Sequence, residues 1–342
     1  MNFRAFFSLC IISIVATALT VPVTTHAQEA PYSPPRTPWG DPDIQGIWPG
    51  NTGVPMQRSE DLGERTTLTD EEFAERAARI EEQAAGDLEE FVTSDRVGLG
   101  PPSYWTERGR AVRETSLIID PPNGRLPELT VEALRYRDEA RDGRGLPGAW
   151  QGEADRPEDM NIYYRCITRG LLGSVIPVIY NNGNQILQAP GYVVFRNEMI
   201  HESRIIPLDS RPHVNSDIKM YMGDSRGHWE GDTLVVETRN FTDKVAIGSN
   251  GAGYPGGPGY HSEDLVVTER FTRLSDDTLS YTATIEDDKT WVEPWTLQIR
   301  LDRDDDYKMF EYACHEANYA MYDILSGARA EEAAAEAAEP EE

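Results

Sequence analysis

The chain has 342 residues and carries 59 acidic side chains against 32 lysines and arginines, which gives a formal net charge of −27 at neutral pH. A field of this sign repels nucleic acids and anionic lipid headgroups, and so excludes both as partners. It favours neutral or cationic small ligands, or serves solubility alone. The length fits one large β domain or two smaller domains.

The N-terminus has the order of a secretory signal peptide. Arg4 is the only cation before a largely apolar stretch at 6–21, and Thr25-His26-Ala27 forms a small-residue cleavage site before Gln28. This stretch is short for a membrane span. We therefore expect residues 1–27 to be removed, leaving a periplasmic or secreted protein without stable membrane insertion. An uncleaved N-terminal anchor is the alternative.

Cysteine usage agrees with export. Cys10 lies in the predicted signal, which leaves Cys166 and Cys314 as the two thiols of the mature chain. Two thiols in an oxidising compartment usually form a disulfide. We predict that they do so here, and a cysteine nucleophile is the alternative.

Residues 28–65 are rich in Pro, Gly and Asp and predict an extended arm that packs on the body. Its apolar anchors are Trp39, Ile44, Ile47 and Trp48. A helical and irregular region, 66–160, follows. Thr69 and Glu72 predict a capping box that starts a helix reaching about Gln83, and a second helix is expected at 130–141. A short strand and a Pro/Gly turn lie between the two helices.

Residues 161–327 predict the main domain. NQILQA and YVVFRNEMIHESRIIPL flank a Pro190-Gly191 turn, and later runs alternate apolar and polar residues, as in Leu279, Tyr281, Ala283 and Ile285. Amphipathic strands joined by short turns indicate an antiparallel meander. So many strands favour closure. The expected fold is thus mainly β, a lipocalin- or calycin-like barrel preceded by the arm and two short helices.

Two further segments complete the chain. The Gly-rich loop 248–259 is interpreted as either a lid or a linker. The acidic, Ala-rich tail 328–342 is expected to be frayed and to carry no site.

Several phrases resemble a widespread family of uncharacterised secreted bacterial proteins. They are TPWGDPDIQGIW, RCITRG, IHESRIIPLDSRPH, GDSRGHWEGDTLVVETRNFTDK, HSEDLVVTERFTR and EYACHEANY, and they extend from about Thr37 to Gly327. The resemblance implies export and attaches no reaction. The lipocalin- or calycin-like barrel is an architectural analogy, which does not deliver function.

The first candidate constellation is a polar row in GDSRGHWEGDT. Asp224, Arg226, His228 and Glu230 share one face of a strand, because side chains repeat every two residues. If that face lines a cavity, His228 and Asp224 are candidate catalytic residues, and Arg226 and Glu230 contact the substrate. The alternative is a solvated row, with Trp229 pointing into the core.

The second constellation lies in IHESRIIPLDSRPH. If the segment is extended, His201 faces inward and is the first candidate for a general base. Asp209 joins it as a catalytic candidate. Arg204, Arg211 and His213 are candidates for substrate binding at the mouth of the cavity. A structural histidine held by hydrogen bonds is the alternative at each position.

The remaining candidates are scattered along the chain. His261, Tyr312 and His315 are further candidates for substrate binding, and a Cys166–Cys314 bridge would hold the last two near the rim. No zinc-type spacing, nucleophile elbow, phosphate loop or dinucleotide fingerprint is present. We therefore predict no metal and no cofactor, with a zinc site built from distant strands as the alternative.

The leading hypothesis is an exported, cofactor-independent enzyme. Its barrel cavity would hold a small, largely apolar or aromatic molecule and carry out acid/base chemistry of the lyase, hydratase or isomerase kind. A periplasmic binding or carrier protein with the same cavity is the second hypothesis. A structural or surface protein with a filled interior is the third.

Overall fold

The computed structural model describes residues 32–51, 53–93, 103–141, 154–160, 162–245, 247, 259–316 and 318–338. The predicted signal peptide at 1–27 and the loop residues 248–258 lie outside the described residues. Contacts divide the chain into two units, Met1–Tyr32 and Ser33–Glu342. All elements named below belong to the second unit.

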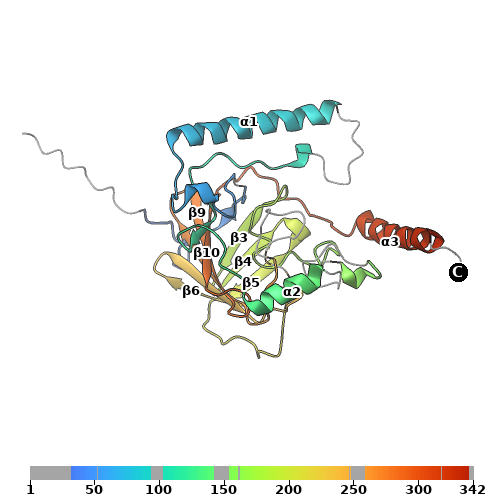
Figure 1. Cartoon of the computed structure of the whole chain (residues 1–342). Coiled ribbons are helices and arrows are strands. Elements are labelled where there is room, and N and C mark those ends of the chain that lie inside the picture. The colour runs from blue at the N-terminus through green and yellow to red at the C-terminus, as the bar shows by residue number, and fades with distance from the viewer. Residues whose placement is uncertain are drawn as a thin grey trace, which may run out of the picture. The chain divides into compact units, whose positions relative to one another are not determined.

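The described strands form two antiparallel sheets (Figure 1). The four-stranded sheet has the order β1-β3-β4-β5, with β1 at Gly46–Ile47, β3 at Asn184–Ala189, β4 at Tyr192–Asn197 and β5 at Ser203–Pro207. The six-stranded sheet has the order β2-β10-β9-β8-β7-β6. Its strands are β2 at Ile118–Asp120, β6 at Asp224–Glu230, β7 at Thr233–Arg239, β8 at Val266–Arg273, β9 at Thr278–Glu286 and β10 at Trp295–Asp302. The prediction of a mainly β, antiparallel meander is confirmed.

A closed barrel is not found in the described part of the chain, where the strands divide between two separate sheets. The edge strands β1 and β2 have only two and three residues, which leaves little backbone to pair one sheet with the other. The sheets instead pack through their side chains, and the ring of Phe195 on β4 lies 4.5 Å from that of Phe271 on β8.

Side chains fill the space between the sheets. Trp48, Tyr281, Trp291 and Trp295 are all at most 2% exposed and belong to one continuous core. The hollow that was expected between the described strands is therefore occupied by the core.

The alternation in the last strands is confirmed residue by residue. On β9 the buried Leu279, Tyr281, Ala283 and Ile285 face the core, and β10 pairs with β9 in regular register from Trp295 to Asp302. The arm contributes β1 to the smaller sheet, because Gly46–Ile47 pairs with β3.

The helices begin where the capping signals place them. Helix α1, Asp70–Thr93, begins after Thr69, whose backbone N–H donates to the Glu72 carboxylate at 2.8 Å. It runs through Gly86 and is therefore longer than predicted. Helix α2 spans Val131–Arg141.

Helix α3, Tyr319–Ala338, includes much of the tail that was expected to fray. Alanine and glutamate are strong helix formers, and their density outweighs the lack of an apolar face. No helix among the described residues is long and apolar enough to cross a membrane.

Candidate functional site

The predicted polar row of β6 lies on the outer face of the six-stranded sheet. Gly227, on the opposite face, packs so closely on β5 of the four-stranded sheet that a Cβ there would lie 2.9 Å from a side-chain atom of Ile206. Trp229 is on that inner face and packs against the core. His228 is consequently 58% exposed in its side chain and contacts Glu230 at 3.2 Å. The solvated-row interpretation therefore describes His228 and Glu230.

The Asp224 end of this row is part of a hydrogen-bond network and is buried. The Asp224 carboxylate accepts the Arg226 guanidinium at 2.6 Å and the backbone N–H of Val214 at 2.9 Å. His213 lies with one ring nitrogen 3.0 Å from Asp224 and the other 3.2 Å from Glu237. Both ring nitrogens of His213 are therefore engaged by carboxylates. The network fixes the loop before β6 to the sheet.

His201 does not face inward as predicted. The chain turns out of the strand in the short helix η4, Met199–His201, and both Ile200 and His201 have a positive φ, of 59° and 43°. The turn leaves His201 exposed. Its Nδ1 lies 3.0 Å from the Tyr312 carbonyl oxygen.

The arginines of this second group are already paired. Arg204 is buried and its guanidinium donates to both oxygens of Glu269, at 2.5 and 2.9 Å, so its assignment to substrate binding is not supported. The Arg211 guanidinium lowers the pKa of the exposed Asp209 carboxyl to about 2, chiefly through their hydrogen bonds. Asp209 therefore stays ionised and holds no proton to donate near neutral pH.

The other histidines do not converge with these groups. His261 is buried beside Phe241, and its Nδ1 lies 2.9 Å from the Ser262 carbonyl oxygen, while His315 is exposed. Burial lowers the pKa of His261. No group of three or more His, Cys, Asp or Glu among the described residues is arranged to hold a metal ion.

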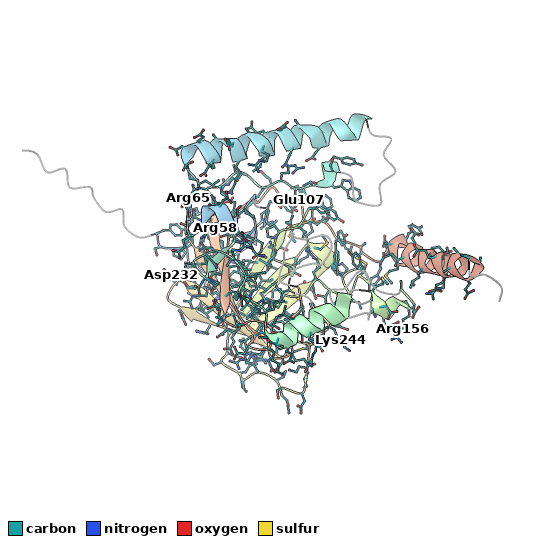
Figure 2. All side chains as sticks on the ribbon, viewed as in Figure 1. Arg58, Arg65, Glu107, Arg156, Asp232 and Lys244 are labelled. Atoms are coloured by element: carbon teal, nitrogen blue, oxygen red, sulfur yellow. A yellow bond between two sulfur atoms is a disulfide. The ribbon has the colours of Figure 1, made fainter. Side chains whose placement is uncertain are left out.

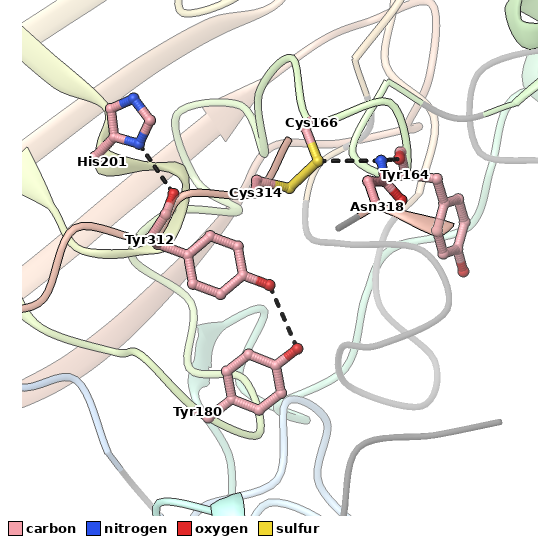
Figure 3. Close-up of a disulfide and its surroundings, with 7 residues drawn as sticks. All are labelled: Tyr164, Cys166, Tyr180, His201, Tyr312, Cys314 and Asn318. Carbon is pink, nitrogen blue, oxygen red and sulfur yellow. Dashed lines mark hydrogen bonds between the residues drawn. A yellow bond between two sulfur atoms is a disulfide. The ribbon is translucent and has the colours of Figure 1, made fainter. Parts of the chain in front are cut away.

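The predicted disulfide is present and gathers distant segments. Cys166 and Cys314 are bonded with their Cα atoms 5.5 Å apart. The bond places the segment after β10, which carries Tyr312, beside the RCITRG segment. Figure 3 shows Tyr312 with its carbonyl oxygen toward His201 and its hydroxyl toward Tyr180.

Aromatic rings surround this junction. The rings of Tyr180 and Tyr312 stack with centroids 6.2 Å apart, and their hydroxyl oxygens are 3.4 Å apart. Trp105, 53% exposed, meets Tyr180 edge-on at 5.8 Å. The ring of Tyr163 lies under the guanidinium of Arg169, 5.3 Å from its central carbon. Tyrosine and tryptophan rings thus lead from the surface to a buried arginine.

Arg169 is the exception among the four arginines that are buried in the described chain. Arg58, labelled in Figure 2, donates to two carbonyl and two hydroxyl oxygens, and Arg273 donates to three backbone carbonyl oxygens. Arg204 is paired with Glu269. Arg169 is only 4% exposed, yet its Nε and Nη2 have no hydrogen-bond partner among the described residues.

The tyrosines near Arg169 do not neutralise it. Burial raises the pKa of Tyr163 and of Tyr312, so both hydroxyls stay uncharged at neutral pH. Burial also lowers the pKa of Arg169, but a guanidinium keeps its proton in proteins. A buried charge without a counter-ion costs several kcal/mol. The cluster of Arg169, Tyr163, Tyr180 and Tyr312, called the Arg169 cluster below, is therefore short of one negative charge.

Several residues near the Arg169 cluster have unfavourable backbone conformations. Cys166, Asn181, Ile200 and His201 all have a positive φ, which is rare outside glycine and most costly for the β-branched Ile200. Glu107, labelled in Figure 2, holds the Asn181 turn by accepting backbone N–H groups there. Such residues concentrate at functional sites, because the surrounding structure has to maintain them.

The residue patterns pointed to Tyr312 and the disulfide but missed Arg169. A signal was present, because Arg169 is the only charge in the run from Cys166 to Tyr180, CITRGLLGSVIPVIY. A single cation in an apolar run predicts a buried charge that needs a partner. Tyr163 and Tyr180 belong to the same stretch of chain as Arg169, whereas Tyr312 comes from a distant segment. The lack of a partner for Arg169 among the described residues is therefore visible only in the fold.

A scan against protein-family models and searches of curated proteins and of solved structures find no match to this chain.

Proposed function

We propose that this chain is an exported binding or carrier protein for a small molecule with an anionic group, and that the ligand binds at the Arg169 cluster. The observation that carries the proposal is the buried guanidinium of Arg169 with two N–H donors unpartnered. A ligand anion would supply the missing charge and accept both hydrogen bonds. The disulfide beside the cluster is consistent with function outside the cytoplasm.

The geometry favours binding over the acid/base enzyme. His201 and His228, the predicted bases, are both exposed, and Asp209 and Asp224 are engaged with arginines. The net charge alone favoured neutral or cationic ligands. A single buried cation gives the opposite local preference, because it acts at contact distance, whereas exposed charges are screened over roughly 8 Å at physiological ionic strength.

An acid/base reaction on the bound molecule is the second candidate, and it rests on His201. The Tyr312 carbonyl can only accept, so Nδ1–H donates to it and the neutral ring keeps a lone pair on Nε2. That nitrogen would be the base. Unchanged turnover of a substrate by the His201→Gln variant would exclude this candidate.

The test measures binding of four small anions to the mature protein by titration calorimetry: acetate, benzoate, phenyl phosphate and benzenesulfonate. We expect at least one to bind to the wild type and to lose its binding in Arg169→Met. Arg239→Met is the matched control, because Arg239 pairs with Glu237 at the surface, and it should bind like the wild type. Binding that survives in Arg169→Met, or no binding of any anion, would contradict the proposal.

A further inference from the structure

The unpartnered atoms of Arg169 form one particular edge of the guanidinium. They are Nε and Nη2, whose N–H bonds point in parallel along the same side of the group. Two parallel donors match the two oxygens of one carboxylate, which is the bidentate geometry that arginine favours.

This chain uses the same edge to bind its own carboxylates. Nε and Nη2 of Arg108 donate to the two oxygens of Asp87, at 2.5 and 2.9 Å. Nε and Nη2 of Arg239 donate to the two oxygens of Glu237, at 2.7 and 3.1 Å. In Arg169 the same edge is buried and contacts no carboxylate of the described residues, so a carboxylate is the group that would complete it.

The charge of the cluster sets the charge of the ligand. Arg169 contributes one positive charge and its tyrosine neighbours contribute none, since burial keeps the hydroxyls of Tyr163 and Tyr312 protonated. A monoanion balances this site, whereas a phosphate dianion would leave a buried excess negative charge. Three nearby rings, Tyr163, Tyr180 and Tyr312, offer faces and edges to a planar body, and aromatic pairs are worth about 0.5–1.5 kcal/mol beyond their buried area.

We infer that the ligand of the Arg169 cluster is an aromatic monocarboxylate, with its carboxylate on the Nε–Nη2 edge of Arg169 and its ring among Tyr163, Tyr180 and Tyr312. This inference rests on the proposed function. It specifies that the anionic group of the ligand is a carboxylate and that the rest of the ligand is a planar aromatic ring. The exposed Trp105, edge-on to Tyr180, lies at the outer end of the same aromatic path.

The test compares probes that differ in one feature. Benzoate is measured against benzamide, which removes the charge, against cyclohexanecarboxylate, which removes the planar ring, and against phenyl phosphate and benzenesulfonate, which change the anion. Each dissociation constant is measured by titration calorimetry on the wild-type mature protein at one salt concentration. We expect benzoate to bind at least about tenfold more tightly than benzamide, because hydrogen bonds to charged groups are worth about 1.5–3 kcal/mol. We expect it to bind about two- to tenfold more tightly than cyclohexanecarboxylate, which keeps the carboxylate and loses the aromatic contacts. Phenyl phosphate and benzenesulfonate should also bind more weakly than benzoate, because their anionic groups do not match the two-donor edge as a carboxylate does.

Arg169→Lys adds a second readout, because it keeps the positive charge and loses the two-donor edge. We expect it to weaken benzoate about tenfold or more and to bring benzoate and benzenesulfonate close together in affinity. Circular dichroism confirms that the variant is folded, and the wild-type comparison stands without it.

The outcomes separate the two proposals. If phenyl phosphate or benzenesulfonate binds as tightly as benzoate and Arg169→Met abolishes both, the carboxylate assignment is wrong and the proposed function stands. If cyclohexanecarboxylate matches benzoate, the aromatic body is wrong. If no probe binds, or if Arg169→Met binds benzoate like the wild type, both proposals fall together.

Discussion

Two arginines that are buried to a similar degree have opposite surroundings in this protein. Arg204 is 7% exposed and its guanidinium is matched by Glu269, which also accepts the Tyr281 hydroxyl. Arg169 is 4% exposed and its Nε–Nη2 edge has no hydrogen-bond partner in the part of the chain that the structure describes. A buried arginine therefore stabilises the fold at position 204 and destabilises it at position 169.

Replacement of each arginine by methionine should reveal this difference. Arg204→Met leaves the Glu269 carboxylate buried and unpaired, so we expect the free energy of unfolding to fall by about 3–5 kcal/mol. Arg169→Met removes an unpaired charge and keeps much of the apolar volume, so the ligand-free protein should be as stable as the wild type or more stable. Urea unfolding followed by fluorescence measures both.

A loss of about 3 kcal/mol or more in ligand-free Arg169→Met would show that Arg169 has a partner in the folded chain, which would remove the basis of the binding proposal. Stability that is unchanged in Arg204→Met would contradict the role of the Arg204–Glu269 pair. These two outcomes are independent, because the arginines do not share a hydrogen-bond partner.

At the level of single residues, the alternation of apolar and polar side chains did not predict the orientation of His201 or the surroundings of Arg169, because both depend on tertiary structure. His201 falls on the apolar face if the strand continues, but Ile200 and His201 adopt a left-handed turn and place the imidazole in solvent. The left-handed conformation is unfavourable for a β-branched residue such as isoleucine, so local preference did not predict this turn. Arg169 was missed because Tyr163, Tyr180 and Tyr312 meet it only in the fold.

Among the elements, the segment after β10 is held to the body by hydrogen bonds along its length and by the disulfide. The Glu198 carboxylate accepts the Tyr307 hydroxyl at 2.7 Å and the backbone N–H of Phe310 at 3.0 Å, and the Cys166–Cys314 bond holds the far end. This segment carries Tyr312 to the Arg169 cluster. Its position is therefore part of the binding site.

Removal of the disulfide should cost more than the loss of a surface contact. The bond closes a loop of 148 residues in sequence separation, and on the chain-entropy model such a link stabilises the fold by up to about 5 kcal/mol. We expect Cys166→Ser with Cys314→Ser to lower the free energy of unfolding by several kcal/mol in urea titrations. Equal midpoints for the wild type under oxidising and reducing conditions would contradict this.

The elements with a strong local signal were predicted well. The period-two alternation of β9 and β10 and the Thr69–Glu72 capping box each encode one local structure, and both are confirmed. Closure into a barrel could not be predicted from the same signal. The alternation of side chains shows which face of a strand is buried, but it does not show which edge strands form hydrogen bonds with each other. The two short edge strands, β1 and β2, leave two sheets instead.

At the scale of the whole molecule, His261 makes the free energy of unfolding depend on pH. It is 2% exposed, and burial lowers its folded pKa below the ordinary value of about 6.5. Between these two values the unfolded chain binds more protons than the folded chain, so protons favour unfolding. The contribution of neutral, buried His261 to the free energy of unfolding is complete above about pH 6.5. Below pH 6.5 this free energy falls by about 1.4 kcal/mol for each pH unit, until the pKa of His261 in the folded protein is reached.

The measurement is the free energy of unfolding of the wild type and of His261→Gln from pH 7.5 to pH 5. All other residues are identical in the two proteins, so the difference between the two curves isolates His261. We expect the variant to have the shallower slope below about pH 6.5. Parallel curves would show that His261 is not neutralised by burial.

The direct test of the proposed binding site is a crystal structure of residues 28–342 with 4-bromobenzoate, whose bromine is located by its anomalous scattering. The account predicts the carboxylate within hydrogen-bond distance of Nε and Nη2 of Arg169 and the bromine among the tyrosine rings. A protein carboxylate on that edge, or bromine bound elsewhere while the Arg169 cluster holds no ligand, would contradict it.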